Sequence, residues 1–166
     1  MFCTLGRARY NFAMDKSAEE VAHLFVRAIN RHDVSSLADM MTSEHRFIDS
    51  LGNVVVGQHE SRRGWAGYFG IVPDYAVTIL ESYGAGPVVI MLGTAKGTFV
   101  PPPPPPTFYP PSQQKAATKP DTELKPENAW KTPVAFRVLV DKGRVAEWRV
   151  YADNEPIREL MRKSRD

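Results

Sequence analysis

The sequence predicts a single α+β domain in which helices pack on one side of a curved antiparallel sheet. Three observations support this fold class: an amphipathic helical pattern after residue 17, a second helical pattern over 58–72, and four later strand patterns joined by short turns. Helices gathered on one face of an antiparallel sheet define the α+β class. A strongly bent sheet leaves part of its concave face unfilled, so we expect an internal pocket.

The first helix has the clearest sequence signal. Ser17 and Glu20 have the spacing of a capping box. Apolar side chains then follow at helical spacing: Val21, Leu24, Phe25, Ala28 and Ile29. Asp33 is expected to cap a short second helix. The inner face of that helix is predicted to contain Leu37, Met40 and Met41.

The next elements are predicted from alternation and from turn residues. Residues 45–49 should form a strand that enters a turn at 50–53, and 54–56 should return as a second strand. The third helix should cover 58–72, with Trp65, Phe69 and Val72 on one face. The later strands are expected at 75–83, 88–99, 133–140 and 144–152, and a final helical turn at 155–162.

Length and charge limit the possible classes of protein. The chain has 166 residues and a net charge of +2. We expect a loose extension at 1–13, with Met14 as an alternative start to Met1, and one domain at 14–166. The basic residues are scattered, so no nucleic-acid partner is expected. No run has membrane-spanning length and no signal peptide is recognisable, so the cytoplasm is the default location.

A proline-rich insertion at 100–128 interrupts the expected domain. Six consecutive prolines begin at Pro101, and such a run builds neither a strand ladder nor a core. Two interpretations remain open. The tract is a polyproline II ligand for an aromatic groove, or it is an extended loop between two neighbouring strands, whose closure entropy rises only slowly with length.

Several short motifs resemble the nuclear transport factor 2-like superfamily, and most of all its SnoaL-like branch. They are Phe-Val-Arg-Ala-Ile-Asn-Arg-His-Asp at 25–33, Phe-Ile-Asp-Ser-Leu-Gly at 47–52, Trp-Ala-Gly-Tyr-Phe at 65–69 and Glu-Trp-Arg-Val-Tyr-Ala-Asp at 147–153. The resemblance covers 17–161 apart from the insertion. It implies a cone-shaped fold, frequent homodimers and hydrophobic small ligands. It does not specify a reaction, because the superfamily holds isomerases, cyclases, dehydratases, epoxide hydrolases and non-catalytic binders.

Asp49 is the first candidate for a catalytic residue. In a strand, His45, Phe47 and Asp49 share one face, and a carboxylate that enters an apolar pocket becomes a stronger base. The resembled steroid isomerases, an established example of pKa tuning, have an aspartate general base at the matching position. The same Asp49 also begins a type I turn signature that ends at Gly52. Both interpretations stay open.

Other residues at the expected pocket bear on its chemistry. By resemblance, the two oxyanion donors of the steroid isomerases correspond to Phe25 and Val134, neither of which can donate a hydrogen bond. Tyr68, Trp130 and His45 are the nearest alternative donors. The predicted pocket lining is Phe25, His45, Phe47, Trp65, Tyr68, Trp130 and Trp148. The histidines lack ligand spacing, so neither a metal nor another cofactor is expected.

The last strand alternates between two faces. Trp148, Val150 and Ala152 are expected to point inward, whereas the opposite set should form an outer sheet face suited to a homodimer or to solvated salt bridges. That outer set is Arg137, Glu147, Arg149 and Tyr151, with an expected ion pair between Arg137 and Glu147. Two functions follow from the whole pattern. One is a pocket protein that binds a small hydrophobic molecule, and the other is a cofactor-free isomerase, cyclase or hydrolase with Asp49 as the base.

Overall fold

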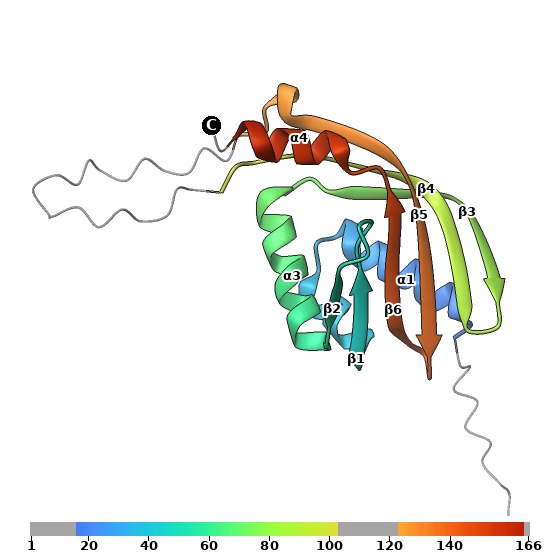
Figure 1. Ribbon diagram of the computed structural model, residues 1–166. Helices are drawn as coiled ribbons and strands as arrows, with labels where there is room; N and C mark the ends of the chain where they lie inside the picture. Colours follow the sequence, from blue (N-terminus) through green and yellow to red (C-terminus); the bar gives the residue numbers. More distant parts are fainter. Residues whose placement is uncertain (1–15, 103–122, 165–166) are drawn as a thin grey trace, which may run out of the picture.

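The computed structural model describes residues 16–102 and 123–164 (Figure 1). The predicted extension at 1–13 and most of the predicted insertion at 100–128 lie outside the described residues. The helices are α1 (Ala18–Asn30), α2 (Val34–Asp39), α3 (Gln58–Ile71) and α4 (Glu155–Lys163), with a 3₁₀ turn at Pro126–Asn128. The strands are β1 (Met41–Ile48), β2 (Val54–Val56), β3 (Ala76–Ala85), β4 (Val88–Thr98), β5 (Ala129–Asp141) and β6 (Arg144–Ala152).

Helix α1 begins at the predicted capping box. The Ser17 hydroxyl accepts from the Glu20 amide at 3.1 Å, and the Glu20 carboxylate accepts from the Ser17 amide at 2.7 Å. Both bonds satisfy amides that have no partner inside the helix. The apolar face of α1 is buried, and its largest fully buried side chains are Phe25 and Ile29. Helix α1 is therefore fixed at its start and along its length.

The strands form one sheet in the order β2-β1-β6-β5-β4-β3. Strands β3 to β6 make an antiparallel meander, as predicted, whereas β1 runs parallel to β6. The sheet curves strongly (Figure 1), and irregular register between Ile79 and Glu81 in β3 accompanies this bend. Gly93 allows β3 to approach β4 here, because a Cβ at this position would lie 2.0 Å from the Thr78 carbonyl oxygen.

Two helices cover different parts of the concave face. Helix α1 contacts β3, β4, β5 and β6, whereas α3 contacts β1 and β2. Figure 1 shows α3 beside β2 and β1, and α4 after the end of β6 and alongside the first part of β5. The hydrophobic core lies between α1 and the sheet, with Trp148, Phe25 and Phe136 among its fully buried side chains. The mixed α+β architecture confirms the predicted fold class.

Some element boundaries differ from the prediction. Met41 was expected on the inner face of the second helix, but α2 ends at Asp39 and Met41 is the first residue of β1. Strand β1 therefore starts four residues before the predicted His45. Pairing of Met41 with Val145 in β6 accounts for this difference, because that contact joins distant parts of the chain and leaves no local sequence signal. Strand β5 likewise begins at Ala129, before the predicted residue 133.

The outer face of the sheet contains a buried carboxylate. Glu147 is 8% exposed and accepts hydrogen bonds from Arg137 on β5 at 2.6 Å and from Arg46 on β1 at 3.4 Å. The predicted pair of Arg137 and Glu147 is confirmed, and Arg46 adds a second cation. Glu147 lies on the outer face, as expected, and the two arginine side chains cover it. In the described residues no helix is long and apolar enough to cross a membrane.

Candidate functional site

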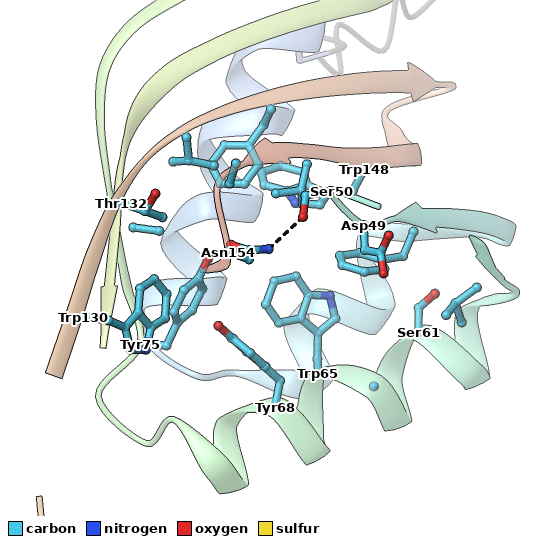
Figure 2. A pocket seen from close by; sticks show the side chains of 18 residues that line it. Asp49, Ser50, Ser61, Trp65, Tyr68, Tyr75, Trp130, Thr132, Trp148 and Asn154 are labelled. Atoms are coloured by element: carbon cyan, nitrogen blue, oxygen red, sulfur yellow. Dashed lines mark hydrogen bonds between the residues drawn. The ribbon is translucent and has the colours of Figure 1, made fainter. Parts of the chain in front are cut away.

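A cavity of about 310 Å³ lies between α3 and the concave face of the sheet (Figure 2). It opens partly to solvent and is lined mainly by aromatic and aliphatic side chains. The aromatic lining consists of Phe47, Trp65, Tyr68, Tyr75, Trp130, Phe136 and Trp148. Protein interiors are normally close-packed, so a void of this size marks a place where a molecule can bind.

Strand alternation and helical spacing create this lining. On β5, Trp130, Thr132, Val134 and Phe136 point inward and line the cavity. On β6, Trp148, Val150 and Ala152 line it, as the sequence predicted for the inward-facing set. Helix α3 contributes Ser61, Trp65 and Tyr68 at positions i, i+4 and i+7. The side chains that line the cavity therefore follow the two-residue repeat of the strands and the helical repeat of α3.

The aromatic side chains form a continuous cluster along one side of the cavity. The Trp65 ring lies 6.1 Å from Phe47 and 6.5 Å from Tyr68, in edge-to-face arrangements. The Tyr68 ring lies 5.0 Å from Tyr75 at 81°, and Tyr75 lies 6.1 Å from Trp130. These distances are within the range of favourable aromatic contacts. The cluster therefore forms a continuous aromatic wall on this side of the cavity.

Polar atoms in this wall lack hydrogen-bond partners. Trp65 Nε1, Trp130 Nε1 and Ser61 Oγ are buried, and none of them has a partner within the described part of the chain. The indole N–H groups can only donate. A buried donor without an acceptor costs free energy, so such groups are uncommon in folded proteins. The hydrogen-bonding capacity of these three groups is therefore unused within the described residues.

Asp49 lines the cavity and also closes its own turn. Its carboxylate accepts from the Leu51 amide at 2.9 Å, the Asn53 amide at 2.8 Å and Asn53 Nδ2 at 2.8 Å. The Gly52 amide donates to the Asp49 carbonyl at 3.0 Å, which completes the predicted turn. Asp49 therefore both lines the cavity and forms the turn, whereas its role as a general base stays a prediction.

The turn weakens Asp49 as a base. Partial burial alone would raise the pKa of the Asp49 carboxyl, but the hydrogen bonds from Asn53 and Leu51 together hold this pKa below its usual value. The carboxylate is therefore ionised at neutral pH and much of its acceptor capacity is occupied. In the view of Figure 2, Asp49 lies on the opposite side of Trp65 from Tyr68 and Tyr75.

Two predicted lining residues lie behind the cavity wall. Phe25 is fully buried, with its ring 4.9 Å from Trp148 and 6.2 Å from His45, and neither Phe25 nor His45 lines the cavity. His45 Nδ1 bonds the Val145 carbonyl at 2.8 Å, whereas Nε2 has no partner among the described residues. Strand β1 begins earlier than predicted and runs beside β6. His45 on this strand is fully buried and packs against Phe25 in the core. The other five predicted residues line the cavity: Phe47, Trp65, Tyr68, Trp130 and Trp148.

Sequence reasoning also missed some lining residues. Thr132 and Phe136 follow Trp130 at steps of two, so strand alternation alone could have placed them on the same face. Tyr75 was expected as the first residue of a strand, but β3 begins at Ala76 and the Tyr75 amide bonds the Val72 carbonyl in the turn after α3, which directs its side chain into the cavity lining. Among the described residues, no group of three or more His, Cys, Asp or Glu side chains is arranged to hold a metal ion.

Comparisons with known proteins agree with this architecture. No curated protein matches the chain. A predicted SnoaL-like polyketide cyclase from Shewanella denitrificans OS-217 is 16% identical with a TM-score of 0.65, covering 88% of this chain and 97% of that one. An LEH-like epoxide hydrolase from M. tuberculosis is 14% identical with a TM-score of 0.63, covering 88% and 90%. A hypothetical protein with a ketosteroid isomerase-like fold from Catenulispora acidiphila DSM 44928, in complex with trimethylamine, is 13% identical with a TM-score of 0.62, covering 83% and 88%.

These low identities establish a shared fold and leave the reaction open, because one fold can support many activities. The family evidence is independent of the structural likeness. The sequence profile of the SnoaL-like domain family matches residues 22–148, which reach from α1 into β6 and include most of the cavity lining. The chain therefore belongs to the SnoaL-like domain family.

Proposed function

We propose that this protein binds a small hydrophobic molecule in the cavity between α3 and the sheet. The observation that carries this proposal is the aromatic cavity of about 310 Å³. Asp49 is the only Asp, Glu, Lys, Arg or His side chain that lines it among the described residues, so an anionic ligand would find no compensating positive charge.

Binding is measurable through the tryptophans, since Trp65, Trp130 and Trp148 all line the cavity. A screen of small aromatic and alicyclic compounds should change tryptophan fluorescence and raise the melting temperature of the protein. A ligand that binds only the folded state stabilises it in proportion to its concentration relative to Kd. A screen in which no apolar compound has either effect would contradict the proposal.

Helix α3 offers a matched pair of variants for this test. Gly64 lines the cavity, Gly67 does not, and a Cβ added at either position meets no atom within 4 Å. Replacing either glycine by leucine should stabilise the helix to a similar extent. Gly64→Leu should then weaken ligand binding, whereas Gly67→Leu should leave it unchanged. Equal affinities for the two variants would place the ligand elsewhere.

The alternative function is a cofactor-free isomerase, cyclase or hydrolase with Asp49 as the general base. Its specific support is that Asp49 lines the same cavity. The bonds from Leu51 and Asn53 oppose it, because they lower the basicity of the carboxylate. Asp49→Asn tests this role with any compound found to be converted. Loss of conversion with retained binding would support the enzyme, and full conversion would exclude Asp49 as the base.

A further inference from the structure

The cavity contains two tyrosine hydroxyls that no other observation explains. Tyr68 comes from α3 and Tyr75 from the segment before β3, and their rings meet edge to face at 5.0 Å. Both side chains line the cavity, and Figure 2 shows their hydroxyl ends directed to the same space beside Trp65. Neither hydroxyl has a hydrogen-bond partner within residues 16–102 and 123–164. Neither oxygen is among the fully buried unpartnered atoms of this region, so both are open to a molecule in the cavity.

We propose that Tyr68 and Tyr75 form a two-donor subsite that binds a carbonyl oxygen of the ligand. The inference rests on the proposed function, since it assigns a polar subsite within the same cavity. A carbonyl oxygen has two lone pairs and can accept from both hydroxyls at once. The two donors therefore select among hydrophobic molecules of similar shape, in favour of those that carry a ketone, quinone or ester oxygen at the matching position.

The protonation state of the two phenols agrees with a donor role. Burial, together with the nearby Tyr75, raises the pKa of the Tyr68 hydroxyl, and burial raises the pKa of the Tyr75 hydroxyl. Both groups therefore keep their protons at physiological pH. A pair of protonated phenols side by side can each donate without repelling the other.

The remaining wall favours a neutral carbonyl over other acceptors. No Lys, Arg or His side chain lines the cavity among the described residues, so the carboxylate of an acidic ligand would lie uncompensated in a space that already contains Asp49. A neutral carbonyl compound needs no such compensation. Ala95 and Val134 provide the apolar surface for its hydrocarbon part.

A pair of probes that differ only in the carbonyl isolates this interaction. 1-Tetralone and tetralin have the same fused-ring skeleton, and the Kd of each is measured by isothermal titration calorimetry. Two hydrogen bonds to one neutral oxygen should make the ketone bind about tenfold more tightly than the hydrocarbon. Tyr68→Phe and Tyr75→Phe should each reduce this ratio about threefold. The double variant should bring the ratio close to one, with the affinity for tetralin little changed.

The matched control is Tyr151→Phe, because Tyr151 lies exposed on the outer sheet face and away from the cavity. It should keep the full preference for the ketone. The carbonyl stretching band of bound 1-tetralone provides a second readout. It should move to lower wavenumber in the wild-type protein than in the Tyr68→Phe/Tyr75→Phe variant. Removal of unpartnered hydroxyls should not lower the melting temperature of either single variant, so these variants remain usable.

The outcomes separate the subsite from the binding function. Equal Kd values for the two probes in the wild-type protein, or a ketone preference that persists in the double variant, would overturn the subsite and leave the hydrophobic cavity intact. A parallel loss of affinity for both probes in the double variant would also overturn it, because it would indicate a structural role for the hydroxyls. Failure of both probes to bind the wild-type protein would overturn the proposed function and the subsite together.

Discussion

Asn154 donates a hydrogen bond from Nδ2 to Ser50 Oγ at 3.0 Å, and this bond joins two segments 104 residues apart in the chain (Figure 2). Ser50 belongs to the turn that contains Asp49, and Asn154 directly precedes α4. Both residues line the cavity. The bond therefore ties the start of the last helix to the turn after β1 at the edge of the proposed binding site.

We expect this bond to contribute about 1 kcal/mol to stability, the usual net value for a partly buried neutral hydrogen bond. Ser50→Ala and Asn154→Ala should each lower the free energy of unfolding in urea by about this amount. The double variant should lose little more than either single variant, because both substitutions remove the same interaction. Losses that simply add would show that the two residues act independently.

Buried His45 should make stability depend on pH. Burial lowers the pKa of His45 below its ordinary value of 6.5, although the bond to Val145 and the charge of Glu147 oppose the shift. The unfolded chain thus takes up this proton more readily than the folded one. The contribution to stability is complete above pH 6.5, and it is lost as the pH falls toward the lower folded pKa.

Urea unfolding at a series of pH values measures this effect. His45→Asn should flatten the dependence below pH 6.5, since an amide can still bond the Val145 carbonyl but does not titrate. His59→Asn is the matched control, because His59 is exposed on α3. A variant of His45 with the same acid sensitivity as the wild-type protein would contradict the prediction.

The two arginines beside Glu147 should differ in their importance. Arg137 bonds Glu147 at 2.6 Å with a side chain 34% exposed, whereas Arg46 lies at 3.4 Å and is 51% exposed. We expect Arg137→Ala to reduce the free energy of unfolding by about 1 kcal/mol and Arg46→Ala by about 0.3 kcal/mol. Chemical denaturation of both variants measures the difference. A larger loss of unfolding free energy for Arg46→Ala than for Arg137→Ala would show that Arg46 is the more important partner of Glu147.

The outer sheet face remains our proposed homodimer interface. Arg149 lies 5.2 Å from the centre of the Tyr151 ring, and Leu80, Tyr83 and Leu92 expose apolar surface. Tyr151→Lys should dissociate a dimer, because it removes aromatic contact and places a second cation near Arg149. Light scattering coupled to size exclusion measures the mass. A wild-type protein that stays monomeric at high concentration would exclude this interface.

Local patterns were sufficient to predict much of the fold. The capping box at Ser17 marked the start of α1 to within one residue, and strand alternation assigned Trp148 and Val150 to the inner face. The early start of β1 at Met41 was not predictable, because it depends on parallel pairing with β6 about a hundred residues away. Local sequence patterns predict whether a segment is a helix or a strand better than they predict which distant strand it pairs with.

The candidate site was predicted less completely, for related reasons. Trp65, Tyr68 and Trp130 were identified because their residue types and spacing suit an apolar pocket. His45 shares a strand face with Phe47, but only the packing of Phe25 and Trp148 decides that the cavity ends before reaching it. The spacing of Asp49 and Gly52 predicted the turn, but it did not predict that the Leu51 and Asn53 amides would donate to the Asp49 carboxylate and weaken it as a base.

The paired ends of β4 and β5 have a practical consequence. Thr98 pairs with Ala129, the Phe99 amide donates to the Asn128 carbonyl at 3.0 Å, and Asn128 Nδ2 returns a bond to the Phe99 carbonyl at 3.1 Å. These contacts clamp the ends of the two strands together. Because the cavity-lining Trp130 lies in β5 directly beside this clamp, we expect a peptide tag inserted between residues 102 and 123 to leave that part of the cavity wall in place.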